Sequence, residues 1–181
     1  VFHKKKIKRK KIMCGIAGLI HRGKSSNVGE ELQHMLQALK HRGPDSTGYA
    51  LYANNDGQNF ILRFKVGENV GEGSTSVNED ESVYNERKKI VDKKLSELGS
   101  LVIKEEKLTP YSYRYEIKFD KDLMEFSKAI ESIQSVEILS IGKSLELIKD
   151  LGDATVVSER YGLNKVQGTH GIGHARMATE S

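Results

Sequence analysis

The stretch KIMCGIAGLI, residues 11–20, holds the only cysteine of the 181-residue chain. Cys14 directly follows a methionine and precedes small and β-branched residues, a pattern that predicts a short buried strand at residues 16–20. A lone cysteine cannot form an intramolecular disulfide and cannot build a thiolate-rich zinc site. Cys14 is therefore either a buried packing residue, the common state of a free cysteine, or a reactive group.

Residues 1–13, in front of this cysteine, are strongly basic. They hold no acidic residue and seven basic ones: Lys4, Lys5, Lys6, Lys8, Arg9, Lys10 and Lys11. Because the whole chain has a net charge of only +4, residues 14–181 by themselves are mildly acidic. A solvated charge run explains the segment most simply, and contact with RNA or an anionic lipid surface is the alternative. We expect a leader that is either untranslated, with initiation at Met13, or removed, and no nucleic-acid partner.

The next part of the chain predicts a compact α+β unit. Leucine and methionine residues recur at helical spacing over residues 32–39, and the Gly-Pro pair within residues 41–45 ends that helix. Strands are expected at residues 49–52 and 60–64. The Asp-Gly pair in residues 54–57 predicts a hairpin between them.

From residue 67 the composition changes to a glycine-rich polar connector, followed by a second α+β segment. Its periodicities predict a helix at 83–98, a strand at 111–119, a helix at 123–133, a strand at 136–141 and a helix at 145–151. Tyr111, Tyr113 and Tyr115 alternate with polar residues in this first strand. We expect them in a core or an interface rather than in a base-stacking platform, because no basic groove accompanies them.

Three segments in a fixed order carry the chemistry: MCGIAGLI at 13–20, HRGPDSTGYALY at 41–52 and GTHGIGHARMATES at 168–181. Together they resemble the class II glutamine amidotransferases, which are N-terminal-nucleophile hydrolases. That family begins with Met-Cys-Gly-Ile, continues with an Arg-Gly-X-Asp-Ser-X-Gly turn, and then has a Gly-X-X-His-X-Arg-X-Ala-Thr strand. The resemblance covers about residues 13–66 and 161–181, and leaves the middle of the chain outside it.

The resemblance implies an α+β fold, here a partial αββα sandwich of the N-terminal-nucleophile type with a small α+β insertion. The expected division is a leader at 1–13, a first amidotransferase part at 14–66, the insertion at 67–160, and a resumed but truncated amidotransferase part at 161–181. The family's oxyanion-hole Asn-Gly pair and its aspartate for the substrate amine would lie beyond Ser181. We therefore expect little or no glutaminase activity from the chain as it stands, since an oxyanion donor contributes about 10²–10³ in rate.

The chemistry of an N-terminal cysteine explains why a leader would have to be absent. A thiol with a pKa of about 8.5 needs a base at neutral pH, and an α-amino group titrating at about 7.7–8.0 on the same residue can be that base. A peptide-bonded nitrogen cannot. By resemblance, Cys14 attacks the side-chain amide of glutamine, forms a γ-glutamyl thioester, releases ammonia and is freed by water.

The resemblance also assigns roles to five other residues. Arg176 corresponds to the arginine that pairs with the α-carboxylate of glutamine, a task that suits its planar guanidinium. Thr179 matches a position that helps to hold the same substrate. Arg42 and Gly43 are expected to shape the loop against the catalytic N-terminus, with the Gly43 carbonyl accepting from the amine. His174 is expected to be a structural hydrogen-bonding residue and not a base.

The Arg-Gly-Pro-Asp-Ser turn and the long insertion most resemble the amidotransferase subunit of glutamate-synthase-type systems. There a separate synthase subunit accepts the ammonia, and flavin or iron–sulfur cofactors would belong to that subunit. An asparagine-synthetase-type domain and a non-catalytic glutamine-binding or regulatory fragment are the alternatives. We expect no cofactor or metal in this chain, no membrane association, and a cytoplasmic location, because no apolar run reaches the ~18 residues of a membrane span.

Overall fold

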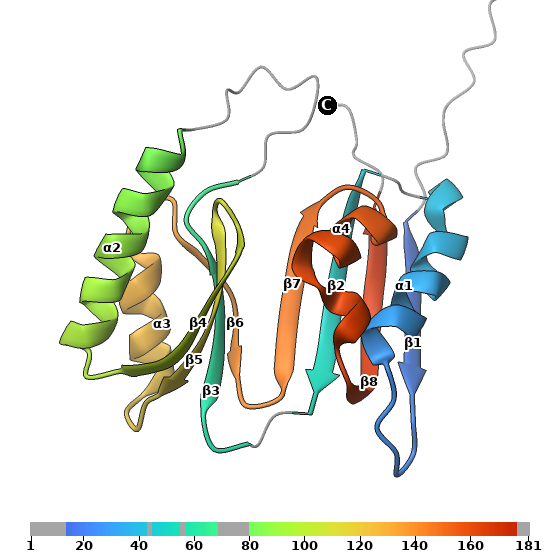
Figure 1. Ribbon diagram of the computed structural model, residues 1–181, viewed down its shortest axis with the longest axis horizontal. Helices are drawn as coiled ribbons and strands as arrows, with labels where there is room; N and C mark the ends of the chain where they lie inside the picture. Colours follow the sequence, from blue (N-terminus) through green and yellow to red (C-terminus); the bar gives the residue numbers. More distant parts are fainter. Residues whose placement is uncertain (1–13, 43–44, 55–56, 69–79, 177–181) are drawn as a thin grey trace, which may run out of the picture.

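The computed structural model describes residues 14–42, 45–54, 57–68 and 80–176, and the described residues form a mixed α/β structure with two four-stranded antiparallel sheets (Figure 1). Sheet A has the strand order β1 (Gly15–Ile20), β8 (Gly168–Arg176), β2 (Ser46–Ala53), β7 (Leu145–Leu151). Sheet B has the order β4 (Leu101–Thr109), β5 (Ser112–Lys118), β3 (Phe60–Lys65), β6 (Glu137–Gly142). The α-helices are α1 (Val28–Ala38), α2 (Glu81–Glu97), α3 (Leu123–Glu131) and α4 (Ala154–Tyr161).

Helices α1 and α4 cover one face of sheet A, and the strand β8 lets α1 approach it closely (Figure 1). A Cβ atom on Gly173 would lie 2.4 Å from Leu36 Cδ1 of α1, and one on Gly171 would lie 3.3 Å from Leu32 Cδ2 of the same helix. Carbon atoms in contact are normally 3.5–4.0 Å apart. The glycines of the GIGHAR motif are therefore packing residues for α1.

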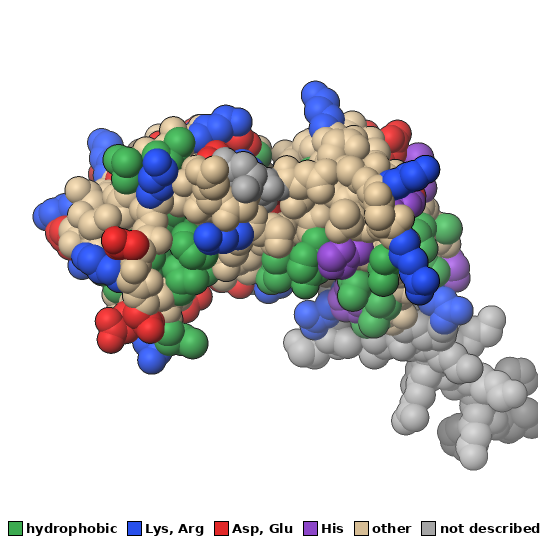
Figure 2. Space-filling model, turned by 90° about the horizontal axis from the view of Figure 1, so that it is seen from below, with side chains coloured by type: hydrophobic (Ala, Val, Ile, Leu, Met, Phe, Trp, Pro, Cys, Tyr) green, Lys and Arg blue, Asp and Glu red, His purple; other side chains and the backbone are tan. Residues whose placement is uncertain are grey.

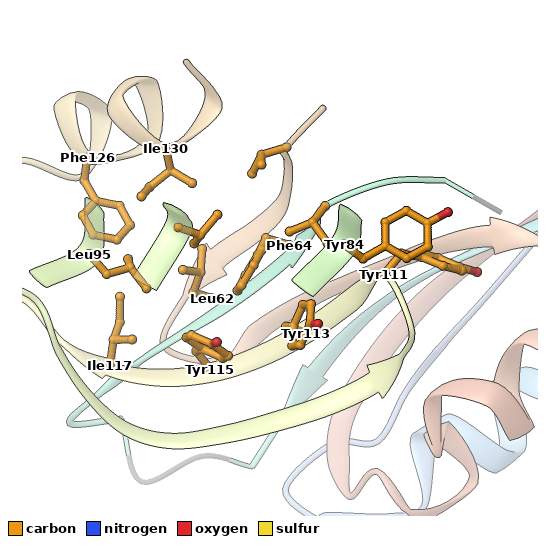
Figure 3. Close-up of a cluster of buried hydrophobic side chains, with 13 residues drawn as sticks. Leu62, Phe64, Tyr84, Leu95, Tyr111, Tyr113, Tyr115, Ile117, Phe126 and Ile130 are labelled. Atoms are coloured by element: carbon orange, nitrogen blue, oxygen red, sulfur yellow. The ribbon is translucent and has the colours of Figure 1, made fainter. Parts of the chain in front are cut away.

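Helices α2 and α3 cover one face of sheet B and enclose an aromatic core (Figure 3). Phe64 lies edge-to-face with Tyr115, with ring centroids 5.0 Å apart, and stacks on Tyr113 at 5.4 Å. Tyr111, Tyr113 and Tyr115 are all buried. Their predicted place in a core is confirmed, and the aromatic geometry stabilises this layer beyond simple area burial.

The two sheets meet at a buried polar interface along β7. Glu146 accepts from Arg63 Nε at 2.6 Å and from Arg114 Nε and Nη2 at 2.9 Å each. Burial alone would raise the pKa of Glu146, but the two guanidinium groups outweigh it and lower that pKa to about 2. Asp150, further along the same side of β7, accepts from Tyr111 OH at 2.7 Å.

The structure confirms the positions of the predicted strands and helices apart from two errors, but the strand at residues 16–20 is not buried as predicted, because Ile16 and Ile20 of β1 lie on an exposed face. The hairpin at residues 54–57 is wrong: β2 pairs with β7 and β8 in sheet A, whereas β3 pairs with β5 and β6 in sheet B. The helix at residues 145–151 is also wrong, because this segment is β7. Its buried side carries Glu146 and Asp150, whose charges concealed the period-two pattern.

Two elements went unpredicted. Strand β4 is an outer edge strand whose side chains are mostly exposed, so its sequence lacks a clean apolar alternation. Helix α4 begins at the side-chain cap of Asp153 and ends at Gly162, which has a φ of +63°. With β3 in sheet B and β7 in sheet A, the sheets interleave along the chain, and the boundaries placed at residues 66 and 160 stay a prediction.

Candidate functional site

Strands β1, β8 and β2 bring the three sequence motifs to one edge of sheet A. In the β1–β8 ladder Gly15 lies opposite Ala175 and Ile16 opposite His174. Continuing this register by one residue places Cys14 opposite Arg176. In the β8–β2 ladder Arg176 lies opposite Ser46, so Cys14, Arg176 and Ser46 form one row across three strands.

Because side chains alternate along β8, the packing residues of the third motif and its candidate site residues lie on opposite faces of sheet A. Gly173 and Ala175 are buried on the side of α1, while His174 and Arg176 belong to the opposite, open face. Gly15 likewise packs against α1's end, because a Cβ atom added to it would lie 3.0 Å from the Cβ of Leu39. Cys14 has the parity of the open-face residue Ile16 and is exposed, so it is not a buried packing residue.

The Arg-Gly-Pro-Asp segment reaches the same edge. Arg42 ends a short 3₁₀ turn, and its N–H donates to Leu39 O at 2.8 Å. Asp45 N–H donates to Arg176 O at 3.2 Å, and Asp45 O accepts from Gly152 N–H at 2.9 Å. Main-chain hydrogen bonds thus tie the second motif to the third. Gly43 and Thr179, the remaining predicted site residues, lie outside the described residues.

A groove of about 420 Å³ crosses the open face from this edge. Its floor is the row of small residues on β2, Ser46, Gly48 and Ala50, which leaves room between the longer side chains of β8 and β7. His174 and Arg176 line its polar end, and Ile172 lines its apolar part. The groove is large enough for an amino-acid side chain to lie between Arg176 and the centre of the sheet.

A second, more polar cavity of about 260 Å³ adjoins Arg176. Its lining mixes cations with acids: Lys65, Lys149, Arg176, Glu68, Glu137 and Asp150. Several of these residues come from β3 and β6 of sheet B or from β7. Sequence reasoning missed them, because their meeting depends on how the two sheets are joined and no local motif marks it.

The open face of sheet A also carries large apolar side chains. Ile16, Ile20 and Ile172 are 72%, 74% and 59% exposed. His170 stacks on Tyr52 on the same face, with ring centroids 3.9 Å apart. Figure 2 shows hydrophobic and histidine side chains gathered together on the half of the molecule that holds sheet A. Such a face is typical of a surface that another element covers.

The described residues hold neither a candidate metal site nor a candidate membrane span. Within residues 14–42, 45–54, 57–68 and 80–176, no cluster of three or more His, Cys, Asp or Glu side chains could hold a metal ion. No helix in that part of the chain is long and apolar enough to cross a bilayer.

The side chains of the site bring an exposed thiol and an arginine to one row. A thiol, once deprotonated, is a nucleophile for a carbonyl carbon, and a guanidinium pairs with a carboxylate. The two groups together suit a substrate that joins a carboxylate to an electrophilic carbonyl.

Comparison with known proteins agrees with this chemistry. Residues 13–61 match the family described as the glutamine amidotransferase domain. The chain is 33% identical over 174 residues to a Methanothermobacter thermautotrophicus protein named "Putative glutamine amidotransferase", covering 93% of the chain and 53% of that protein. It is 29% identical over 175 residues to a glutamine amidotransferase-like protein of Rhizobium meliloti, covering 93% of the chain and 51% of that protein.

The chain thus contains a glutamine amidotransferase-like domain, and it spans about half the length of these curated relatives. The matched residues 13–61 include Cys14 and the Arg-Gly-Pro-Asp sequence at 42–45 but not Arg176. Both relatives align over nearly the whole chain, sheet B included.

Proposed function

We propose that this chain is the nucleophile-bearing part of a class II glutamine amidotransferase, in which Cys14 attacks glutamine and Arg176 binds its α-carboxylate. The observation that carries the proposal is the β1–β8 register, which, continued by one residue from Gly15, sets Cys14 opposite Arg176, a residue that lines the groove. A residue in this row is within reach of its neighbour's side chain, since paired strands lie about 4.8 Å apart. One bound amino acid can therefore contact both.

The proposed reaction uses the free α-amine of Cys14 as its base. The amine takes the thiol proton, and the thiolate forms a bond to the γ-carbonyl carbon of glutamine. The C–N bond then breaks, and ammonia leaves with that proton. Water attacks the γ-glutamyl thioester in the second half-reaction, which releases glutamate and restores the thiol and amine. Arg176 holds the same carboxylate throughout, and so it contributes to binding in both halves.

The class II fold would place a second sheet against the open face of sheet A, as the αββα sandwich requires. Two observations support this part of the proposal. The exposed isoleucines Ile16, Ile20 and Ile172 form an apolar layer of the kind that covers a partner sheet. The relatives are about twice as long as this chain, which leaves enough sequence for such a layer. The oxyanion hole would come from that part.

The ammonia would pass to a synthase partner of the glutamate-synthase type. This part of the proposal rests on the Arg-Gly-Pro-Asp-Ser sequence at 42–46 and on the long segment between the motifs, which includes sheet B. Any flavin or iron–sulfur cofactor would reside in the partner, and no step assigned to this chain uses one.

The test is made on the full-length protein produced from its native gene. Intact-mass analysis is expected to show Cys14 as the first residue, and a glutamine-analogue electrophile such as 6-diazo-5-oxonorleucine is expected to label it. Cys14→Ala should abolish labelling and glutaminase activity together. A version with a permanent tag in front of Cys14 should bind glutamine but remain unlabelled. Equal labelling of the tagged protein would overturn the α-amine mechanism, and an unlabelled native protein would indicate a non-catalytic glutamine-binding module.

A further inference from the structure

Asp150, near the end of β7, lies where sheet B meets sheet A, and its carboxylate collects side-chain donors from sheet B and from helix α4, which packs on sheet A. Its Oδ2 accepts from Tyr111 OH at 2.7 Å, from Tyr161 OH at 2.9 Å and from Arg160 Nη1 at 3.0 Å. Its Oδ1 lies 3.6 Å from Lys65 Nζ. Lys65 belongs to sheet B and Tyr111 to its β4–β5 turn, whereas Arg160 and Tyr161 belong to α4, so a buried carboxylate of sheet A joins the two layers.

The same carboxylate also fixes the chain that follows it. Asp150 Oδ1 accepts from the N–H of Leu151 at 2.8 Å, which orients the entry to the Gly152 turn. Gly152 has a φ of +115°, a conformation that glycine adopts readily and other residues do not. The turn is held from the other side by Thr47 Oγ1, which donates to Gly152 O at 2.8 Å.

The Gly152 turn in turn holds the arginine end of the candidate site. Its N–H donates to Asp45 O at 2.9 Å, and Asp45 N–H donates to Arg176 O at 3.2 Å. Asp45 is therefore clamped by its main chain between the turn and the strand that carries Arg176. The polar cavity beside this clamp is lined by both Asp150 and Arg176.

We infer that Asp150 is a positioning residue that couples sheet B to Arg176 through Leu151, Gly152 and Asp45. Sheet B then helps to set the position of Arg176, and a change in the contact between sheet B and β7 alters that position. The kinetic part of this inference rests on the proposed function, whereas the structural coupling does not.

The strand β7 supplies a matched control. Glu146 lies on the same side of β7, is equally buried, and also binds cations of sheet B, namely Arg63 and Arg114. Its partner in β2 is Leu51, well away from the Ser46–Arg176 row. Asp150→Asn and Glu146→Gln each remove one buried negative charge from the same interface. Only Asp150→Asn changes a residue that is hydrogen-bonded to the Leu151–Gly152 turn and so is linked to Arg176.

The coupling is tested by amide hydrogen exchange on the full-length protein. Asp150→Asn is expected to speed exchange at the Asp45 and Gly152 amides by about tenfold, because local opening of these hydrogen bonds becomes easier. Tyr111→Phe, which removes only one hydroxyl, is expected to give a smaller change of the same kind and serves if Asp150→Asn does not fold. Glu146→Gln should leave both amides unchanged. Equal exchange in all three variants, or no change in Tyr111→Phe, overturns the inference.

Steady-state kinetics give the second readout. If Arg176 binds the α-carboxylate equally in ground and transition states, its displacement raises KM for glutamine and leaves kcat nearly unchanged. Tyr111→Phe is expected to raise KM several-fold, and Glu146→Gln is expected to keep the wild-type KM. An inactive wild-type protein with altered exchange in Tyr111→Phe would refute the proposed function and leave the coupling standing. An active wild-type protein whose Tyr111→Phe variant shows unaltered exchange would refute the coupling and leave the proposed function standing.

Discussion

Ile16 on β1 lies directly opposite His174 on β8, and this single pairing determines which face of sheet A the candidate site residues of both strands occupy. Because side chains alternate along a strand, the pairing puts Cys14, His174 and Arg176 on the open face of sheet A and Gly15, Gly171 and Gly173 on the helix face. A shift of one residue would exchange the two faces. The close packing of α1 on Gly171 and Gly173 excludes that shift.

Arg176 tests the proposed carboxylate contact. Arg176→Gln removes a charge-assisted pair, whose contribution is about 1.5–3 kcal/mol, and is expected to raise KM for glutamine by about 10–100-fold. Arg176→Lys keeps the charge but not the bidentate geometry, and an intermediate KM is expected. Glutaminase assays on the full-length protein measure both. Arg22→Gln, at an exposed arginine just past the far end of β1, should behave as wild type. Identical kinetics in all the variants would contradict the assignment.

Gly173 tests the structural account of the GIGHAR motif. Gly173→Ala forces a methyl group to within 2.4 Å of Leu36 Cδ1, and overpacking of this kind costs about 1–3 kcal/mol in the free energy of unfolding. Gly18→Ala on the neighbouring strand is the control, because its Cβ would make only ordinary contacts at 3.4 Å. Denaturant unfolding of both variants decides the matter. A Gly173→Ala protein as stable as Gly18→Ala would show that α1 does not pack as described.

The sequence was most informative where periodicity was uninterrupted by buried charge. The apolar spacing of α1 and the alternation of β5 predicted those elements correctly. Strand β7 was mistaken for a helix because its buried side carries Glu146 and Asp150, and a charged residue in a sequence looks exposed. Those acids are buried because Arg63, Arg114 and Lys65 of sheet B neutralise them, and such partners become known only once the sheets are placed.

The candidate site, like the fold, could be predicted from the sequence only in part. The three motifs named Cys14, Arg42, His174 and Arg176. The strand register brings Cys14, His174 and Arg176 to one face of sheet A, and Arg42 lies in the short 3₁₀ turn after α1. Ser46, Gly48 and Ala50 lie within the second motif, but nothing in the sequence marked them as the floor of a groove, and the polar cavity and the Asp150 contacts left no signal in the sequence. They arise from pairings between segments that are about a hundred residues apart, such as Ser46 with Leu151.

Glu146 makes the stability of the chain depend on pH. Its pKa falls from an ordinary 4.5 to about 2 in the folded protein, so its contribution is fully present above pH 4.5 and is lost as the pH falls towards 2. At about 1.36 kcal/mol per pKa unit, this loss is about 3 kcal/mol. Glu146→Gln should be less stable at pH 7 but show a shallower decline between pH 5 and pH 2. Unfolding curves across this range measure it, and parallel declines would refute the assignment. Asp150, whose pKa is also lowered, titrates in both proteins.

The open face of sheet A predicts self-association of this chain when it is made alone. Ile20 and Ile172 are large apolar side chains that are 74% and 59% exposed, and neighbouring apolar groups extend the patch. Ile20→Lys combined with Ile172→Lys is expected to reduce association in light scattering while leaving the fold intact, because neither side chain belongs to the core. Ile148→Lys, on the buried face of the same sheet, should unfold the chain instead. If the double variant associates as strongly as the original chain, the contact lies elsewhere, and the exposed edge strand β4 becomes the surface to change next.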